Sequence, residues 1–243
     1  MKVEEIKPYG AEGSKRTQVE RMFNNIAHSY DQLNHTLSLG IDGVWRRNAI
    51  EVLKPFAPQQ ILDVATGTGD LALLACRELR PQTVVGCDIS EGMMEVGRRK
   101  VAEAELAERI RFQYEDCACL SFADNTFDAV ISAFALRNFD QLDLCLREMC
   151  RVLKVGGRLS VIDLCTPQSF PMRQLFYLYK KVVMPVVGRI VSHDHTAYTY
   201  LPRTMDAIPQ AAAMQRIVGN AGFREVACKR LLFGMCMLYT AKK

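Results

Sequence analysis

The stretch that decides the fold is Ile61-Leu62-Asp63-Val64-Ala65-Thr66-Gly67-Thr68-Gly69-Asp70. A short apolar run ends in an acid, passes through a glycine-rich turn and enters an apolar helical pattern. A second apolar run, Thr83-Val84-Val85-Gly86-Cys87, then ends at Asp88. This order predicts a βαβ unit with a ligand site at the carboxyl ends of its strands, and Asp88 follows Gly67 at the roughly 20-residue spacing of an acid that binds ribose hydroxyls.

The glycines decide between two ligands that such a unit can bind. The dinucleotide fingerprint G-x-G-x-x-G has a third glycine for close helix packing, whereas the position three after Gly69 is Ala72. Asp70 would also place a carboxylate beside a pyrophosphate. S-adenosylmethionine carries an ammonium and a sulfonium and no phosphate, so the acid before the loop, Asp63, suits it better. The pattern therefore favours S-adenosylmethionine, with a tight turn that binds no ligand as the alternative.

Strand and helix patterns alternate outward from this unit. Short apolar runs predict strands at 60–64, 83–87, 109–114, 127–134 and 157–163. Helical spacing predicts helices at 70–79, 91–104 and 141–153, the last one stopped by Gly156-Gly157. This alternation predicts an α/β fold with a doubly wound, mostly parallel sheet.

Helical segments precede the predicted sheet and a hairpin follows it. Residues 1–17 are polar, and we expect them to be loosely held apart from an anchoring contact. Apolar residues from Val19 to Leu33 recur at helical spacing and predict one amphipathic helix, and Val44–Leu53 predicts a second. Two runs that alternate around Gly234, at 224–232 and 235–241, predict a closing antiparallel hairpin.

The length of 243 residues predicts a single domain. We divide it into an N-terminal helical segment at 1–55, a cofactor-binding core at 56–166, a lid on the substrate side at 167–209, and a C-terminal helix and hairpin at 210–243. The net charge of +4 comes with no cluster of basic residues that could bind nucleic acid. The N-terminus has no apolar signal-peptide core, and no run of 18 apolar residues exists, so we expect a cytoplasmic protein. Nine cysteines without a C-x-x-C pair indicate free thiols.

Further motifs extend over nearly the whole chain. They lie at Phe23-x-x-Ile26-Ala27-x-x-Tyr30-Asp31-x-x-Asn34, Leu37-Ser38-x-Gly40 with Trp45-Arg46, Phe134-Ala135-Leu136-Arg137-Asn138, and Asp194-x-x-x-Tyr198-x-Tyr200-Leu201. Together with the glycine loop they resemble the class I methyltransferases of the UbiE/MenG type, which C-methylate quinols in menaquinone and ubiquinone biosynthesis. The resemblance implies a Rossmann-like S-adenosylmethionine-dependent methyltransferase fold with helical N-terminal and lid segments. The sequence departs from the family's pattern at Ala133, Ala135, Cys117 and Asp163-Leu164-Cys165.

The cofactor-binding residues that we expect follow successive strands. They are Asp63, Gly67, Thr68, Gly69, Asp88, Ile89, Asp116 and Cys117. Asp63 can face the cationic amino-acid part of S-adenosyl-L-methionine, and the glycines let the backbone approach the ligand. Asp88 can accept both ribose hydroxyls. The resemblance implies that Asp116 accepts the adenine amine and that the backbone N–H of Cys117 meets the ring.

The catalytic residues that we expect are Arg137, Asn138, Asp194, Tyr198 and Tyr200. Arg137 is not ordinarily deprotonated, so it should stabilise a phenolate rather than remove a proton. Asn138 would orient a hydroxyl or an ordered water. The general base stays open among Asp194, Tyr198 and Tyr200, with His193 beside them. The run His193-Asp194-His195 lacks a further ligand set, so we expect no metal.

The resemblance implies a polyprenylated quinol as substrate. Demethylmenaquinol is the leading candidate, 2-methoxy-6-polyprenyl-1,4-benzoquinol is the alternative, and another small-molecule methyl acceptor is a third. Residues 170–191 combine large apolar groups with Arg173, Lys180 and Lys181. This composition predicts a mobile cover that makes peripheral contact with the inner face of a membrane. An ordinary core helix, or a helix at a homodimer interface, is the alternative for this segment.

Overall fold

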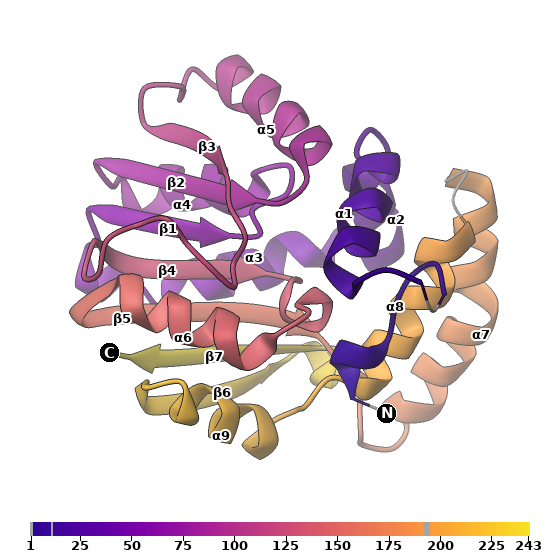
Figure 1. The fold of residues 1–243 in the computed structure, drawn as a ribbon. Coiled ribbons are helices and arrows are strands. Elements are labelled where there is room, and N and C mark those ends of the chain that lie inside the picture. The colour runs from indigo at the N-terminus through magenta and orange to yellow at the C-terminus, as the bar shows by residue number, and fades with distance from the viewer. Residues whose placement is uncertain (1, 11, 192–194) are drawn as a thin grey trace.

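The computed structural model describes residues 2–10, 12–191 and 195–243. A seven-stranded sheet with the order β3-β2-β1-β4-β5-β7-β6 crosses the molecule (Figure 1). Its strands are β1 Gln60–Val64, β2 Thr83–Asp88, β3 Ile110–Tyr114, β4 Phe127–Ala133, β5 Leu153–Leu164, β6 Arg224–Leu231 and β7 Cys236–Lys242. Strands β1 to β5 pair in parallel, and β7 pairs antiparallel to both β5 and β6. The predicted mostly parallel α/β sheet with a closing antiparallel hairpin is confirmed.

Helices cover both faces of the sheet, and the alternation along each strand explains why. In β1, Ile61 packs with α3 Ile41–Glu51, α4 Asp70–Leu79 and α5 Glu91–Glu103 on one face. Its neighbour Leu62 packs on the other face with α6 Leu142–Val152 and α9 Ala212–Asn220. Both side chains are fully buried, as expected of a central parallel strand that has helices on both sides.

Four more helices stand beside the carboxyl edge of the sheet (Figure 1). They are α1 Lys15–Ile26, α2 Tyr30–Ser38, α7 Met172–Val191 and α8 His195–Ala207. Short 3-10 turns lie at Val3–Glu5, Lys54–Phe56, Leu136–Asn138 and Leu232–Gly234. The loops that follow β1, β2, β3 and β4 therefore face these helices, and ligand cavities form between the two groups.

The N-terminal region differs from the sequence expectation in two ways. The single helix expected from Val19 to Leu33 is two helices, because the Ser29 hydroxyl donates to the carbonyl of Ile26 (3.2 Å) and competes with helix continuation. The described part of residues 1–17 is also held by more than the single anchoring contact that we expected. Val3 and Ile6 are buried apolar residues, and Lys15 is buried with them.

The glycine pair after α6 also has a different role from the one expected. The helix ends at Val152, before the glycines, and β5 begins at once at Leu153. The pairing of β4 with β5 shifts between Phe127 and Ala129, and Gly156 has a φ of +86°. The glycines therefore form an irregularity inside the strand, where a left-handed residue is needed, and do not end the helix.

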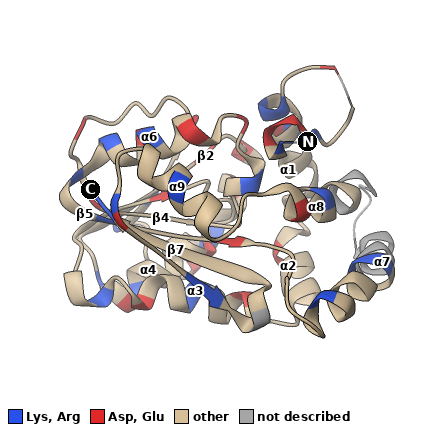
Figure 2. Cartoon of the chain, turned by 90° about the horizontal axis from the view of Figure 1, so that it is seen from below, with Lys and Arg blue, Asp and Glu red and all other residues tan. Residues whose placement is uncertain are grey.

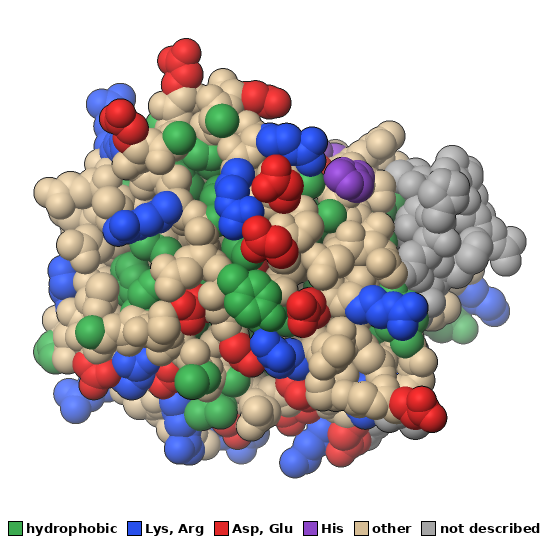
Figure 3. All heavy atoms as spheres, turned by 45° about the horizontal axis from the view of Figure 1, so that its top comes forward, with side chains coloured by type: hydrophobic (Ala, Val, Ile, Leu, Met, Phe, Trp, Pro, Cys, Tyr) green, Lys and Arg blue, Asp and Glu red, His purple; other side chains and the backbone are tan. Residues whose placement is uncertain are grey.

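Charged side chains of both signs are distributed over the described part of the molecule. Figure 2 shows Lys and Arg interspersed with Asp and Glu along the helices. The face in Figure 3 has the same mixture over α1 and α5. In the described ranges, no helix is both long enough and apolar enough to cross a bilayer.

Candidate active site

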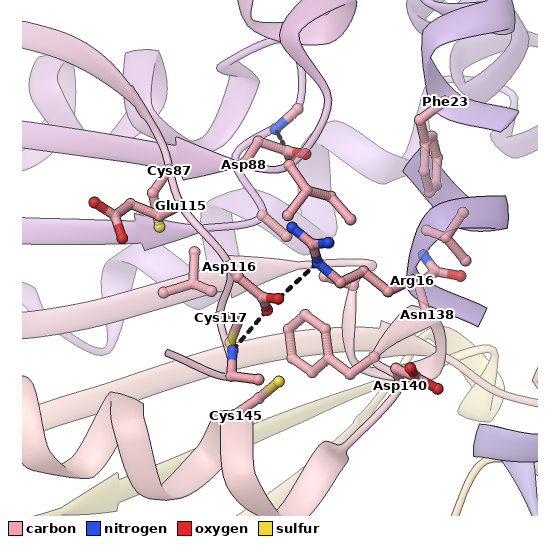
Figure 4. Close-up of a pocket in the computed structure, with 18 of the residues that line it drawn as sticks. Arg16, Phe23, Cys87, Asp88, Glu115, Asp116, Cys117, Asn138, Asp140 and Cys145 are labelled. Atoms are coloured by element: carbon pink, nitrogen blue, oxygen red, sulfur yellow. Dashed lines mark hydrogen bonds and ion pairs between the residues drawn. The ribbon is translucent and has the colours of Figure 1, made fainter. Parts of the chain in front are cut away.

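A first cavity, with about 860 Å³ of empty space, lies where β1, β2, β3 and β4 end (Figure 4). Five of the expected cofactor residues line it, namely Gly67, Asp88, Ile89, Asp116 and Cys117. Helix α1 closes the opposite side with Arg16, Val19 and Phe23. The structure thus brings together residues that follow three different strands.

The carboxylate of Asp88 lies at the end of β2 and is already held by the backbone. Its Oδ2 accepts from the N–H of Gly67 (2.8 Å) and its Oδ1 from the N–H of Ser90 (2.9 Å). Burial raises the pKa of Asp88 to about 6 in spite of these hydrogen bonds. Each oxygen keeps a second lone pair, so both can still accept a ligand hydroxyl. Gly67 has a φ of +58°, and a Cβ there would lie 3.2 Å from the Met93 methyl group.

The carboxylate of Asp116 faces the same cavity from the loop after β3. Its Oδ1 accepts from the N–H of Ala118 (2.9 Å). Its Oδ2 lies 2.6 Å from Nε of Arg16, which reaches across from α1 (Figure 4). Burial raises the pKa of the adjacent Cys117 thiol well above its usual value, so this group stays neutral. Sequence reasoning missed Arg16, because an isolated arginine on an amphipathic helix carries no motif.

A small polar hollow of about 310 Å³ continues from the first cavity beneath the glycine loop, and Tyr30, Ala65, Gly67 and Ala133 line both. Asp63 lies at its base with Oδ2 accepting from the Thr66 hydroxyl (2.7 Å). Its Oδ1 is buried and makes no hydrogen bond of normal geometry to the described residues. Burial, with the charge of Asp88 nearby, raises the pKa of Asp63 to about 7. A cationic ligand group in this hollow would restore the ionised form.

The other two residues of the glycine loop have different surroundings. The Thr68 hydroxyl lines the small hollow and donates to Oδ1 of Asp31 on α2 (2.6 Å). Lys100 donates to Oδ2 of the same carboxylate (2.8 Å) and also to Asp70. Gly69 has a φ of +78°, and a Cβ there would lie 2.8 Å from the Phe112 ring. Thr68 therefore ties the loop to α2, and Gly69 is needed for packing behind the loop.

A second cavity, of about 1170 Å³, opens between α2, α3, α7 and α8. Its wall is mostly apolar, with residues such as Leu37, Trp45, Phe176 and Met205. Phe134 lines both this cavity and the first one. The two cavities therefore meet at the ring of Phe134, which also packs edge-on against Trp45 with 6.1 Å between ring centroids.

Arg137 and Asn138 are neighbours in the 3-10 turn Leu136–Asn138, yet they face different cavities. Arg137 lines the second cavity, whereas Asn138 lines the first. The buried Arg137 donates from its backbone N–H to Oδ2 of Asp163 (2.8 Å) and from Nη1 to the carbonyl of Phe134 (2.6 Å). Nη1 also pairs with Oδ1 of Asp163. Its Nε is buried and has no hydrogen-bond partner within the described ranges.

Of the remaining predicted catalytic residues, Tyr200 alone has a described side chain. Its helix α8 contacts the turn Leu136–Asn138, and the charge of Arg137 acts on the Tyr200 hydroxyl. Tyr200 packs in an apolar cluster with Ile6, Val19 and Met22. Burial raises its pKa, and within the described part of the chain it is on the wall of neither cavity. Tyr198 belongs to α8, with a side chain outside the description. Asp194, with His193, lies outside the described residues.

A buried charge cluster that sequence reasoning missed lies between the second cavity, which Asp42 lines, and the small polar hollow, which Arg46 lines. Asp42 on α3 accepts from the Ser38 hydroxyl (2.7 Å) and pairs with Arg46. Burial opposes ionisation of Asp42, but these hydrogen bonds outweigh it and lower the pKa to about 2. Arg46 lies over the Phe134 ring, 5.0 Å from its centroid, and 3.5 Å from Asp70. The signal was the motif that contains Trp45-Arg46, to which no role was assigned.

The described residues include no group of three or more His, Cys, Asp and Glu side chains placed to hold a metal ion. The arrangement is instead three carboxylates that follow successive strands in one connected cavity, and a fixed guanidinium in an apolar cavity beside it.

Comparisons with known proteins agree with this geometry. The chain is 58% identical over 240 residues to a demethylmenaquinone methyltransferase of Bacteroides fragilis, covering 99% of this chain and 98% of the relative. A protein of the same name from Porphyromonas gingivalis is 47% identical over 241 residues, with the same coverage. The ubiquinone/menaquinone biosynthesis C-methyltransferase UbiE of Geobacter sulfurreducens is 40% identical over 230 residues, covering 94% of this chain and 90% of the relative.

Solved structures show the same fold at low identity. Phosphoethanolamine N-methyltransferase 2 of Haemonchus contortus, solved with S-adenosyl-L-methionine, matches with a TM-score of 0.66 at 16% identity, over 96% of this chain and 60% of that chain. A SAM-dependent methyltransferase of Aquifex aeolicus matches with a TM-score of 0.57 at 20% identity, over 79% of this chain and 88% of that one. The model of the ubiE/COQ5 methyltransferase family matches residues 11–243. The expectation drawn from the motifs is confirmed: the chain belongs to the ubiE/COQ5 methyltransferase family.

Proposed function

We propose that the chain transfers a methyl group from S-adenosylmethionine to a ring carbon of demethylmenaquinol, which yields menaquinol. One observation carries this proposal: a cavity that holds the carboxylates of Asp88 and Asp116 meets an apolar cavity at Phe134, and the turn Leu136–Asn138 contributes one side chain to each. A methyl donor with cationic groups fits the first cavity. A flat apolar ring with a hydrocarbon tail fits the second.

The choice of substrate is supported by the relatives. The two at 58% and 47% identity are named demethylmenaquinone methyltransferases. The UbiE relative at 40% identity carries both quinones in its name and supports 2-methoxy-6-polyprenyl-1,4-benzoquinol as the alternative. The higher identity and nearly complete coverage of the first two favour demethylmenaquinol.

The residues of the first cavity and its polar hollow fit S-adenosylmethionine. The incompletely hydrogen-bonded Oδ1 of the buried Asp63 suits the cationic amino-acid end. Asp88 would accept the ribose hydroxyls, and Asp116 with the Cys117 N–H would meet the adenine. When bound, the cofactor supplies a methyl group activated by the sulfonium. The backbone at Gly67 can approach the cofactor closely because glycine has no Cβ. A Cβ at this position would also lie 3.2 Å from the Met93 methyl group.

The role proposed for Arg137 is to stabilise the phenolate form of the quinol. A quinol carbon becomes a better nucleophile when the adjacent phenolic oxygen loses its proton. The guanidinium is fixed by Asp163 and by the Phe134 carbonyl, so it needs no reorganisation when that charge develops. Its apolar surroundings exclude water and strengthen the interaction.

Among the residues proposed to accept the phenolic proton, Tyr200 is the least suitable. Burial raises the pKa of Tyr200, so this hydroxyl holds its proton more tightly than an ordinary tyrosine and is a poor base. His193, Asp194 and Tyr198 remain the proposed candidates. Asn138 lines the first cavity, where its amide donates to the Phe134 carbonyl (3.3 Å). We propose that its carbonyl oxygen orients a water or hydroxyl beside the methyl donor.

The outer face of α7 is proposed to meet the membrane in which a polyprenyl quinol resides. Phe170, Leu175 and Leu178 are 82%, 56% and 59% exposed. Leu175 also lines the second cavity, so the apolar surface continues into the proposed substrate site. Lys181 lies on the same segment, 6.0 Å from the Tyr177 ring. Anionic lipid at the inner face of a membrane attracts such basic residues, which favours this contact over a homodimer of α7 faces.

The test of the substrate assignment is the quinone profile of a strain that lacks the gene. We expect this strain to accumulate demethylmenaquinone. The wild-type gene should reverse the accumulation, and a gene that encodes the Asp88→Ala variant should not. Accumulation of a benzoquinone lacking its ring methyl, with normal menaquinone, would establish the alternative instead.

A further inference from the structure

Lys15 is a buried lysine that the proposed reaction does not use. It lies at the start of α1, and its side chain is 0% exposed. A lysine on the first turn of an amphipathic helix is normally solvated, and a buried ammonium is stable only when hydrogen-bonded and balanced by opposite charge. The buried ammonium of Lys15 must therefore be stabilised by the groups around it.

The partners of Lys15 lie in the N-terminal segment and in the turn that carries Arg137. Its Nζ donates to the carbonyl oxygen of Arg137 (2.8 Å) and to that of Val3 (2.8 Å). The backbone N–H of Arg137 is bound by Asp163. Charged side chains thus hold the main chain of Arg137 on both sides, from α1 and from β5.

We infer that Lys15 is a positioning residue, which holds the turn Leu136–Asn138 so that Arg137 faces the second cavity while Asn138 faces the first. The inference rests on the proposed function. Without the ammonium, the carbonyl of Arg137 loses the donor that fixes it from α1, and the turn is held only by its contacts to Asp163 and to the backbone that precedes it. The guanidinium is then held less firmly beside the proposed quinol site.

The electrostatic surroundings make this device sensitive to pH. Burial lowers the pKa of Lys15 to about 8. The charged groups that face it come from each element packed around it: Glu4 near the N-terminus, Arg137 in the turn, Asp140 after the turn, and Asp163 at the end of β5. The carboxylates favour the ammonium, and burial and Arg137 oppose it. Loss of the charge weakens the hydrogen bond to the Arg137 carbonyl, so turnover should fall as the pH rises through this range.

The experiment compares Lys15→Met with Lys7→Met. Lys7 lies in the same N-terminal segment and also donates to a backbone carbonyl, that of Gly13 (2.6 Å), away from the catalytic turn. We expect Lys15→Met to lower kcat at least tenfold, with the dissociation constant for S-adenosylmethionine changed less than twofold. Hydrogen exchange at 136–138 should become faster in Lys15→Met without any ligand. Lys7→Met should match the wild type in all three measurements.

A second variant covers the case in which Lys15→Met does not fold. Lys15→Arg keeps the charge at all accessible pH values. In the wild type, kcat should fall as the pH rises through about 8, and in Lys15→Arg it should not. Three results would each overturn the inference. The first is a Lys15→Met variant with unchanged kcat and unchanged hydrogen exchange, and the second is a variant that loses cofactor binding and turnover in parallel. The third is a wild-type pH profile in which kcat does not fall near pH 8. Inactivity of the wild type would instead reject the proposed function, and the exchange measurement would still decide the role of Lys15.

Discussion

Asp163 binds Arg137 twice, through the backbone N–H with Oδ2 (2.8 Å) and through the guanidinium with Oδ1. Both residues are buried, so neither can exchange its partner for water. This double contact makes the cation a fixed part of the second cavity rather than a mobile side chain. It also means that a change at either residue acts on both folding and turnover, and the two effects must be measured separately.

Arg137→Leu should lower turnover about a hundredfold or more, the scale expected for loss of a preorganised electrostatic group. Cofactor affinity should stay near that of the wild type, because Arg137 faces the second cavity and not the first. The free energy of unfolding should fall by about 3–5 kcal/mol, since Asp163 is left as a buried unpaired charge. Steady-state kinetics, calorimetric binding and thermal melts measure the three quantities. Wild-type turnover in the folded variant would refute the role.

Asp88→Ala should weaken S-adenosylmethionine binding by about 1.5–3 kcal/mol, the scale of hydrogen bonds to a charged group. The reason is that its carboxylate is held at the cavity with acceptor positions to spare. Isothermal titration calorimetry measures the change. Glu95→Ala, on the outer side of α5, is the matched control and should bind normally. An unchanged dissociation constant in folded Asp88→Ala would remove Asp88 from the site.

Cofactor affinity should increase as the pH rises from below 6 to above 7. The pKa values of Asp88 and Asp63 in the free protein are raised to about 6 and about 7. The ionised carboxylates bind hydroxyls and a cation better than the neutral acids, so binding lowers these pKa values and releases protons. Calorimetry in buffers of different ionisation enthalpy measures the release. Asp63→Asn should reduce the change of cofactor affinity with pH near pH 7. A cofactor affinity that falls as the pH rises would contradict the placement of Asp63 and Asp88 in the cofactor site.

The same raised pKa predicts a stability effect at Asp63. Its folded-state pKa of about 7 lies above the usual 3.8, so the folded state binds more protons than the unfolded state between these values. Stability contributed by the neutral acid is therefore lost as the pH rises through this window. Asp63→Asn should raise the melting temperature more above pH 7 than below pH 4. Equal shifts at both pH values would argue against a buried, strained carboxylate.

Contact of α7 with a membrane should depend on charge and on salt. We choose Lys181→Glu with Leu178→Gln, because Lys180 is already held by Asp206 (2.5 Å) and is a poor probe. The pair should reduce binding to anionic liposomes and activity on long-tailed quinol, and leave a short-tailed analogue unaffected. Lys229→Glu, on β6 at the far edge of the sheet, is the control. Equal loss with both substrates would mean that the segment is structural.

Local patterns in the sequence predicted those parts of the site that depend on strand direction and on backbone conformation. Acids that follow apolar strands must meet at the carboxyl edge of a parallel sheet, and Asp63, Asp88 and Asp116 do so. The glycine loop predicted the close approach at Gly67, although Gly69 proved to serve packing against Phe112. These features follow from strand direction and backbone conformation alone.

The rest depends on contacts between distant segments, which periodicity does not encode. Lys15 and the Arg137 carbonyl are 122 positions apart in the chain, and a lysine in a helical pattern indicates a solvated position. Asp163 was noticed only as a departure from the family pattern. The opposite directions of Arg137 and Asn138 follow from a 3-10 turn, whose conformation is set by the groups that hold it.

The central claim is tested most directly by transfer of a labelled methyl group from S-adenosylmethionine to a quinone of defined redox state. Reduced and oxidised demethylmenaquinone are each incubated with the wild-type protein under anaerobic conditions, and the products are analysed by mass spectrometry. The account predicts one labelled methyl group on the ring of the reduced substrate and none on the oxidised one, because only the quinol can form the phenolate that Arg137 stabilises. Equal labelling of both forms, or labelling of neither, would contradict it.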